Sequence, residues 1–441
     1  MFCRVLISTC VLLFFAASAR SAELSVGPGK GFARIEQAVA SAQPDDTIRV
    51  FPQPDNKPYE RPAIYVTKAR LTIRSAAPAG QRVRLCGDGF DYSGRGSTPR
   101  AIVQFNKGAD GCVLEGFELY GAHNDSHNGA GVRINQANDI VVRNCHIHDN
   151  DMGIMSNGDG TAATAVNQLI ESCLIHTNGN MKDPGYNHNL YLGGTSVRLV
   201  ACEVHSSLTG HNVKSRAHRT IVLASYIHDS CNREFDLVDA KGDTTASDSH
   251  AAIVGCIIAK SPKCAGNRGV IHFGQDGGNE HDGTLFLAHN TIVTPFMSPV
   301  VSLSSPRSRA QLLNNIVWDG GSRQAGQQLV DARKPGNPDQ TVTGRCNWLS
   351  SGFEVPALVT FGLEQTLLAK AGVNPPFMDP AKGNYRLARS EPTMVDAGAP
   401  LPPELVKLIG GTMLQYEAPL RSVQRSAKEK PDPGAFEQSN P

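Results

Sequence analysis

Two short stretches of the sequence repeat one pattern and place a candidate proton-transfer pair at matching positions. Asn189 begins the run Asn-Leu-Tyr-Leu, and Asn212, 23 residues later, begins Asn-Val-Lys-Ser. This distance is about one turn of a coil built from β-strands, so Tyr191 and Lys214 would point outward from successive strands. Because neighbouring strands lie about 4.8 Å apart, the phenol and the amine would meet on one exposed face. Such a pair could move protons to and from a bound substrate.

A longer repeat surrounds this pair. One strand pattern, a small residue followed two positions later by Ile or Val, starts again near positions 144, 172, 201, 224, 255, 290 and 314. Self-similarity at such a period predicts a solenoid. Side chains alternate across a strand, so four cysteines fall at one inward position and should stack as small buried side chains: Cys145, Cys173, Cys202 and Cys256. Cys231 and Cys264 lie outside this column and are candidates for a disulfide.

A second strand precedes this one in each coil, and its middle residue is predicted to face solvent. The outward column then reads Arg133, Met155, Tyr191, Lys214, Asp236, His272 and Ser302. The fold class predicted from both patterns is all-β, a single-domain parallel β-helix.

The two ends of the chain differ from the repeat. Residues 1–22 combine Arg4 with an apolar run and small residues, as a signal peptide does, so we expect a secreted or periplasmic protein. Residues 23–320 form the predicted solenoid, and the helical spacing of apolar residues from Phe32 to Ala42 indicates an N-terminal cap. Residues 321–441 are expected to pack on the solenoid and close its other end.

The overall composition argues against several kinds of partner. The chain has 42 Lys and Arg against 41 Asp and Glu, so no strong field recruits nucleic acid or a membrane surface. After the leader, no segment approaches the ~20 apolar residues of a membrane span. We expect a monomer that binds neither nucleic acid nor a membrane.

The repeat resembles the pectin-lyase-like superfamily of right-handed parallel β-helix proteins over roughly residues 24 to 320. Segments such as Asn374–Pro380 and Asp432–Glu437 look like the closing segment common in secreted bacterial β-helix proteins. The resemblance implies a right-handed coil. It says little about chemistry.

A narrower resemblance centres on Val213-Lys214-Ser215, which is similar to the segment that carries the catalytic lysine in polysaccharide lyase family 6, the family of chondroitinase B and alginate lyases. In that family a lysine acts as base, an arginine one coil on assists as acid, and calcium neutralises the uronate carboxylate. This chain departs from the pattern, because Asp236 takes the place where an arginine would be convenient.

Eliminating a 4-linked uronate requires neutralisation of its carboxylate, a base for the C5 proton and a proton donor for the leaving oxygen. Lys214 and Tyr191 are the predicted catalytic pair, with the order of their roles open. Lysine needs burial or cationic neighbours to act as a base, and nearby arginines could supply these neighbours and hold a polyanion. The predicted substrate-binding residues are Asn189, Asn212, Arg216, Arg133, Arg233, His272 and His211. Strand alternation points His211 inward, so it could equally be a structural turn histidine.

Calcium takes six to eight oxygen ligands, and the acidic residues Glu234, Asp236 and Asp239 are candidates to hold it. The same residues allow a second interpretation. Asp236 with Glu234 or Asp239 could be the paired carboxylates of a glycoside hydrolase. A uronate epimerase would share the proton abstraction, and a third alternative is a non-catalytic envelope protein that binds glycans.

Overall fold

The computed structural model describes residues 21–240, 247–296, 298–322, 326–332, 340–354, 360–388, 394–426 and 429–438. The first 20 residues of the predicted signal peptide lie outside this part of the chain. Among the described residues, no helix has the length and apolar character needed to span a membrane.

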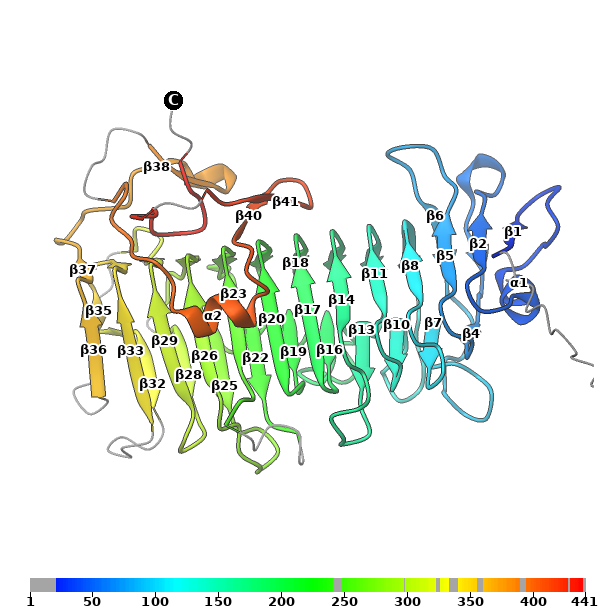
Figure 1. Cartoon of the computed structure of the whole chain (residues 1–441), viewed down its shortest axis with the longest axis horizontal. Helices are drawn as coiled ribbons and strands as arrows, with labels where there is room; N and C mark the ends of the chain where they lie inside the picture. Colours follow the sequence, from blue (N-terminus) through cyan, green and yellow to red (C-terminus); the bar gives the residue numbers. More distant parts are fainter. Residues whose placement is uncertain are drawn as a thin grey trace, which may run out of the picture.

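Three long parallel sheets wind around one interior (Figure 1). Each complete coil contributes one strand to each sheet, and strands of consecutive coils pair in parallel. Sheet A holds β1 (Glu23–Val26), β2 (Thr47–Val50), β5 (Thr72–Ser75), β8 (Val113–Glu115), β11 (Val141–Arg143), β14 (Gln168–Glu171), β17 (Ser196–Val200), β20 (Arg219–Leu223), β23 (Ala251–Val254), β26 (Thr284–Ala288), β29 (Arg309–Leu313), β33 (Thr341–Arg345) and β36 (Thr360–Glu364).

The other two sheets follow the same coils. Sheet B holds β3 (Tyr59–Glu60), β6 (Val83–Cys86), β9 (Phe117–Tyr120), β12 (His146–His148), β15 (Leu174–His176), β18 (Glu203–His205), β21 (Tyr226–His228), β24 (Ile257–Ala259), β27 (Thr291–Val293), β30 (Ile316–Trp318), β34 (Trp348–Leu349) and β37 (Leu367–Leu368). Sheet C holds β4 (Ile64–Val66), β7 (Ala101–Asn106), β10 (Ala130–Asn135), β13 (Met152–Asn157), β16 (Leu190–Leu192), β19 (Val213–Ser215), β22 (Phe235–Val238), β25 (Ile271–Gly274), β28 (Val301–Leu303) and β32 (Val330–Ala332). The predicted parallel β-helix is confirmed.

Small and β-branched side chains fill the interior, as the repeat predicts. The four cysteines of the predicted column are fully buried and carry free thiols. Cys231 and Cys264 are also free, so the predicted disulfide between them is wrong. Instead, the Cys264 thiol contacts the carbonyl oxygen of Cys231 at 3.1 Å.

A ladder of asparagines runs through the interior at the corner that precedes sheet C. Asn178 donates to Asn189 at 2.9 Å, Asn189 donates to Asn212 at 2.8 Å, and Asn212 donates to Glu234 at 2.6 Å. All four side chains are buried. The predicted outward orientation of Asn189 and Asn212 toward a substrate is therefore wrong. Each precedes its strand at a bend where the alternation of side chains does not hold, and the inward side chain satisfies backbone and side-chain groups of the corner.

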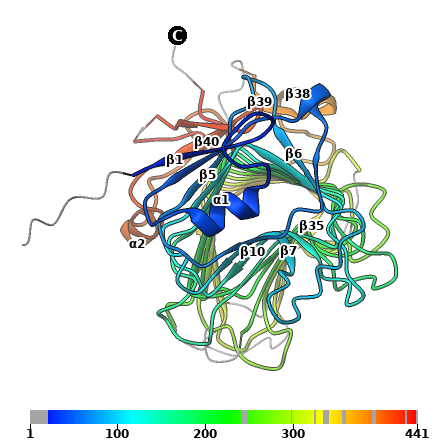
Figure 2. The same cartoon turned by 90° about the vertical axis from the view of Figure 1, so that its right-hand side faces the viewer.

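The N-terminal end is covered by α1 (Ile35–Ser41), as predicted (Figure 2). Ile35, Ala38 and Val39 are its buried side chains. The predicted end of the solenoid at residue 320 is wrong, because β32, β33, β34, β36 and β37 add further strands to all three sheets.

The segment beyond the last coil folds back along the outside of the solenoid (Figure 1). It contains β38 (Phe377–Asp379), β39 (Asn384–Leu387), α2 (Pro403–Leu408), β40 (Leu414–Glu417) and β41 (Arg421–Gln424), while the short strands β31 (Gln327–Gln328) and β35 (Phe353–Glu354) belong to the last coils. Helix α2 buries Leu405 on sheet A, and β40 buries Tyr416 against sheet B. The described residues of this segment thus pack on parts of the outer faces of sheets A and B, and none of them packs on sheet C.

Replacing Asn212 by Ala should destabilise the protein strongly, because it removes four buried hydrogen bonds, to Asn189, Ser207, His228 and Glu234, in the interior. We expect the free energy of unfolding in urea to fall by about 2 to 4 kcal/mol. Asn135→Ala is the matched control, since Asn135 also lies in an asparagine ladder but is only half-buried. Water can replace its bonds, so its loss should cost less than about 1 kcal/mol. Equal losses for both variants would contradict the role of the buried ladder.

Candidate active site

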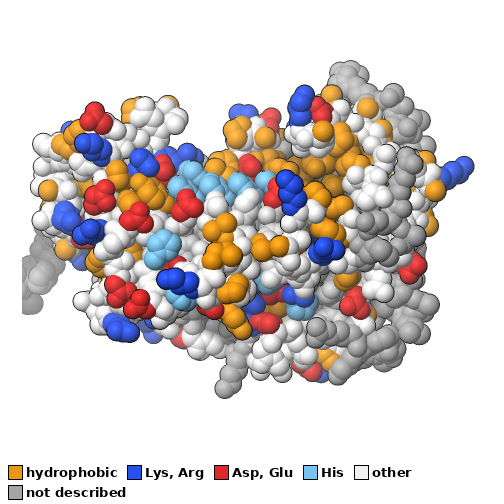
Figure 3. Space-filling view, turned by 180° about the vertical axis from the view of Figure 1, so that it is seen from behind, with side chains coloured by type: hydrophobic (Ala, Val, Ile, Leu, Met, Phe, Trp, Pro, Cys, Tyr) orange, Lys and Arg blue, Asp and Glu red, His pale blue; other side chains and the backbone are white. Residues whose placement is uncertain are grey.

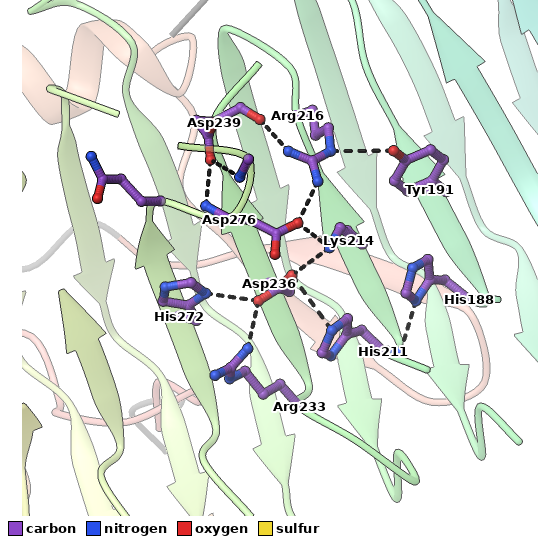
Figure 4. Close-up of polar contacts among 12 residues, drawn as sticks. His188, Tyr191, His211, Lys214, Arg216, Arg233, Asp236, Asp239, His272 and Asp276 are labelled. Atoms are coloured by element: carbon purple, nitrogen blue, oxygen red, sulfur yellow. Dashed lines mark hydrogen bonds and ion pairs between the residues drawn. The ribbon is translucent and has the colours of Figure 1, made fainter. Parts of the chain in front are cut away.

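The outward column of sheet C gathers a cluster of charged side chains (Figure 4). Tyr191 pairs in register with Lys214, Lys214 with Asp236, and Asp236 with His272. The predicted register of this column is confirmed. Because the strands are parallel and unshifted here, the four side chains follow one another along the outside of the solenoid.

Lys214 lies between two carboxylates. Its Nζ is 3.0 Å from Oδ2 of Asp236 and 2.8 Å from Oδ2 of Asp276, and the residue is only 8% exposed. The sequence predicted cationic neighbours around this amine, whereas its direct contacts are acidic. An ammonium group held in this way is set to donate hydrogen bonds, and its position is fixed from two sides.

Arg216 connects Tyr191 to Asp276, one of the two carboxylates that bind Lys214. Its Nε donates to the phenol oxygen of Tyr191 at 3.2 Å, while the guanidinium also contacts the carboxylate of Asp276 and the carbonyl oxygen of Asp239. The predicted place of Arg216 beside the pair is confirmed. Its positive charge at the phenol oxygen would stabilise a phenolate that forms during a reaction.

Asp236 is the centre of the cluster. Its carboxylate is 2% exposed and contacts Lys214, Nη1 of Arg233 at 2.9 Å, Nδ1 of His272 at 2.8 Å and Nε2 of His211 at 3.4 Å. Burial opposes its ionisation, but the hydrogen bond from His272 and the positive charge of Lys214 hold the pKa of Asp236 well below its usual range. The carboxylate therefore stays ionised and orients the cations around it.

Two histidines, His188 and His211, lie beside the outward column, just before strands β16 and β19. The backbone N–H of His211 donates to Nδ1 of His188 at 3.0 Å, and the two rings stack with centroids 5.1 Å apart. The inward direction that strand alternation predicted for His211 is wrong, because this residue also stands at the bend before its strand and reaches Asp236. Burial lowers the pKa of His211 to about 4, so its imidazole is neutral near neutral pH.

The predicted calcium ligands do not form one site. Glu234 faces the interior, where Asn212 and Ser230 bond its two oxygens. Asp239 accepts backbone N–H groups of Gly277 and Asn279, both at 3.0 Å. Asp236 is occupied by cationic donors. Glu234 cannot pair with Asp236 as the two carboxyl groups of a hydrolase, because it lies on the opposite side of the sheet.

Arg133 is the predicted binding residue that lies away from the cluster. It pairs with Met155, which pairs with Tyr191, and it donates to Asn157 at 3.2 Å. Asp276 is the residue that sequence reasoning missed. It follows β25 in a loop outside the repeat, so no periodic signal could have placed it on Lys214.

A hollow of about 740 Å³ lies elsewhere, between the outer face of sheet A and helix α2. Its lining includes Arg198, Arg219, Asp248 and Lys407. Arg219 and Asp248 pair with each other there. We place the candidate site on sheet C, because a phenol, an amine and two carboxylates come together there and part of this charged cluster is buried.

Comparison with known proteins supports the fold. No protein-family model matches the sequence, and no curated protein sequence matches it either. Among solved structures, a complex of XylC with xylose has a TM-score of 0.55 at 9% identity, covering 94% of this chain and 98% of that chain. Pectate lyase Pel9A has a TM-score of 0.49 at 13% identity, covering 95% of this chain and 97% of that chain. The protein has a parallel β-helix fold, as its three parallel sheets and the likeness to the XylC structure show.

Replacing Asp236 by Asn should destabilise the protein, because it leaves several buried cationic donors without their counter-charge. We expect a loss of about 3 to 5 kcal/mol in the free energy of unfolding near neutral pH. The contribution of Asp236 is present above the pKa of an unfolded aspartate and is lost as the pH falls through its lower folded pKa, so the variant should also show a flatter decline in acid. Asp248→Asn is the control: it removes a half-exposed partner of Arg219 and should cost less than about 1 kcal/mol. A variant as stable as the parent would argue against Asp236 as the centre.

Proposed function

We propose that this protein is an exported lyase that cleaves an acidic, uronate-containing polysaccharide by β-elimination at Tyr191 and Lys214. One observation carries the proposal. Lys214 and Arg216 both bind the carboxylate of Asp276, and Arg216 also touches the phenol of Tyr191. A carboxylate site and a proton-transfer group therefore lie side by side on sheet C.

Asp276 marks where a substrate carboxylate would bind. Its side chain is 40% exposed and comes from a loop, so it can leave the two cations when a uronate group replaces it. Binding of the uronate carboxylate by Lys214 and Arg216 would neutralise its charge and acidify the C5 proton, the role that calcium plays in the lyase family resembled by the Lys214 segment. The proposed mechanism uses these two cations for the neutralisation.

The two proton transfers fall to neighbouring groups. Tyr191, as a phenolate stabilised by Arg216, removes the C5 proton. The C4–O bond then breaks as the C4–C5 double bond forms, and the ammonium of Lys214 donates its proton to the leaving oxygen. Asp236, 3.0 Å from Nζ, acts as a positioning residue for Lys214.

The hydrolase alternative fits this site less well. A glycoside hydrolase needs a carboxylic acid that still holds its proton near neutral pH. Despite the effect of burial, the cationic neighbours of Asp236 and Asp276 lower the pKa of both. Backbone N–H groups lower that of Asp239 in the same way. An epimerase would use the same abstraction without chain cleavage, and a glycan-binding protein would use the cations alone.

Tyr191→Phe and Lys214→Met should each lower the rate of elimination by about 10²- to 10⁴-fold, because each removes one proton-transfer group. The assay follows the ultraviolet absorbance of 4,5-unsaturated ends released from alginate, pectate and glycosaminoglycans. Arg133→Gln is the control, a charge removed from the same face two strands from Tyr191.

Each alternative outcome points to another activity. Saturated reducing ends would indicate a hydrolase, and an altered uronate composition without fragments would indicate an epimerase. Binding without turnover on every polymer would identify a glycan-binding protein. Full activity of Tyr191→Phe and Lys214→Met would remove both residues from the mechanism.

Asp276→Asn tests the carboxylate site itself. Removing the competing charge should lower KM for the acidic polymer by roughly fivefold, since a partly exposed ion pair is worth about 1 kcal/mol. The turnover number should change little, because Asp276 leaves the cations before reaction. A large fall in kcat with unchanged KM would instead assign Asp276 to catalysis.

A further inference from the structure

A row of stacked imidazoles crosses the outer face of sheet B (Figure 3). His148, His176, His205 and His228 occupy one position on successive strands. Neighbouring ring centroids are 5.3, 4.8 and 4.8 Å apart, and the planes deviate by 18° at most. This row lies on a different sheet from Tyr191 and Lys214.

One end of the row brings three imidazoles and a carboxylate together. His146 and His148 leave the same face of β12, because they are two residues apart on one strand. His176 pairs with His148 from one side, and Glu118 of β9 pairs with His146 from the other. Nε2 of His146 is 2.8 Å from Nε2 of His176, and Nε2 of His148 is 3.4 Å from Oε1 of Glu118.

Two of the three Nδ1 atoms already have oxygen partners. Nδ1 of His148 is 2.7 Å from the carboxylate of Asp149, and Nδ1 of His176 contacts the hydroxyl of Thr177. Oxygen partners at Nδ1 fix the ring orientation and leave Nε2 for a metal ion, which is the usual arrangement around metal-bound histidines. Two imidazole nitrogens facing each other, as in His146 and His176, also suit a shared cation.

We propose that Nε2 of His146, His148 and His176 and the carboxylate of Glu118 bind a divalent transition-metal ion of the zinc type. One ligand atom from each of Glu118, His146 and His148 lies within 4.8 Å of the others. Zinc takes four such ligands at about 2.0 to 2.2 Å, so ligand atoms about 3.3 Å apart are required. The distances of 2.8 and 3.4 Å bracket this value. Glu118, His146 and His148 already converge, and the His176 side chain has to turn toward them to serve as the fourth ligand.

The second half of the row has a tyrosine in the place of one proposed metal ligand, His146. Glu203, His205 and His228 also converge. However, Tyr226 takes the place on β21 that His146 takes on β12, and the Tyr416 hydroxyl occupies Glu203 at 3.2 Å. Tyr226 stacks on His228 with centroids 4.0 Å apart. This group therefore lacks the second imidazole of a His-x-His pair and provides an internal control.

The experiment is a titration of the untagged, metal-free mature protein with zinc alone, followed by calorimetry, and with cobalt, followed by visible absorbance. We expect one equivalent to bind, with the cobalt spectrum of a tetrahedral site and a rise in Tm. His146→Gln and His148→Gln should each weaken zinc binding by at least about tenfold, while His205→Gln should bind as the parent does. Circular dichroism of each variant checks the fold, and Glu118→Gln replaces any variant that fails to fold.

Three results would overturn the proposal: no zinc binding by the parent, unchanged binding by the His146 and His148 variants, or an equal loss in His205→Gln. The last result would assign zinc to the row as a whole. None of these readouts depends on lyase activity, so the outcome is independent of the function proposed for sheet C.

Discussion

Backbone pairing between consecutive coils is the constraint on which this structure depends. Parallel strands with no register shift place each side chain directly beside its counterpart one coil away, about 4.8 Å off. Tyr191 is therefore paired with Lys214, and Lys214 with Asp236, whatever their chemical character. The same rule stacks cysteines and asparagines inside and imidazoles outside. Residue types that repel one another would be costly at these positions, so the alternation of charges along sheet C follows from the architecture.

The burial of these side chains makes the opposite charges of neighbouring residues necessary for stability. Asp236 is almost fully removed from solvent, and its charge is tolerable only because Lys214, Arg233 and two histidines surround it. Each cation then has a fixed place, and Arg216 extends the chain of contacts to Tyr191. The sheet thus holds the proton-transfer pair in place. The carboxylate that binds Lys214 and Arg216 comes from outside the sheet, either from Asp276 or from a substrate.

Periodic features of the sequence predicted the periodic features of the structure. The outward column and the cysteine stack follow from alternation along a strand, and the helical spacing of Ile35, Ala38 and Val39 predicted the cap. Alternation ends at a bend, however, so Asn189, Asn212 and His211 took directions that the pattern could not give. Asp276 contacts Lys214 across 62 residues through a loop without repeat. The last coils were missed because irregular sequence with several prolines separates their strands, so the repeated strand pattern is not visible there.

The returning C-terminal segment changes how this solenoid should come apart. In a simple stack, each coil touches only its neighbours, so coils can detach one at a time from an end. Here Ile409 accepts a hydrogen bond from Arg198, and Tyr416 donates to Glu203, both across more than 200 residues of sequence. These two hydrogen bonds tie coils in the middle of the cylinder to the C-terminal segment that carries α2 and β40. Fraying at the C-terminal end has to break these bonds first, which couples the coils into one cooperative unit.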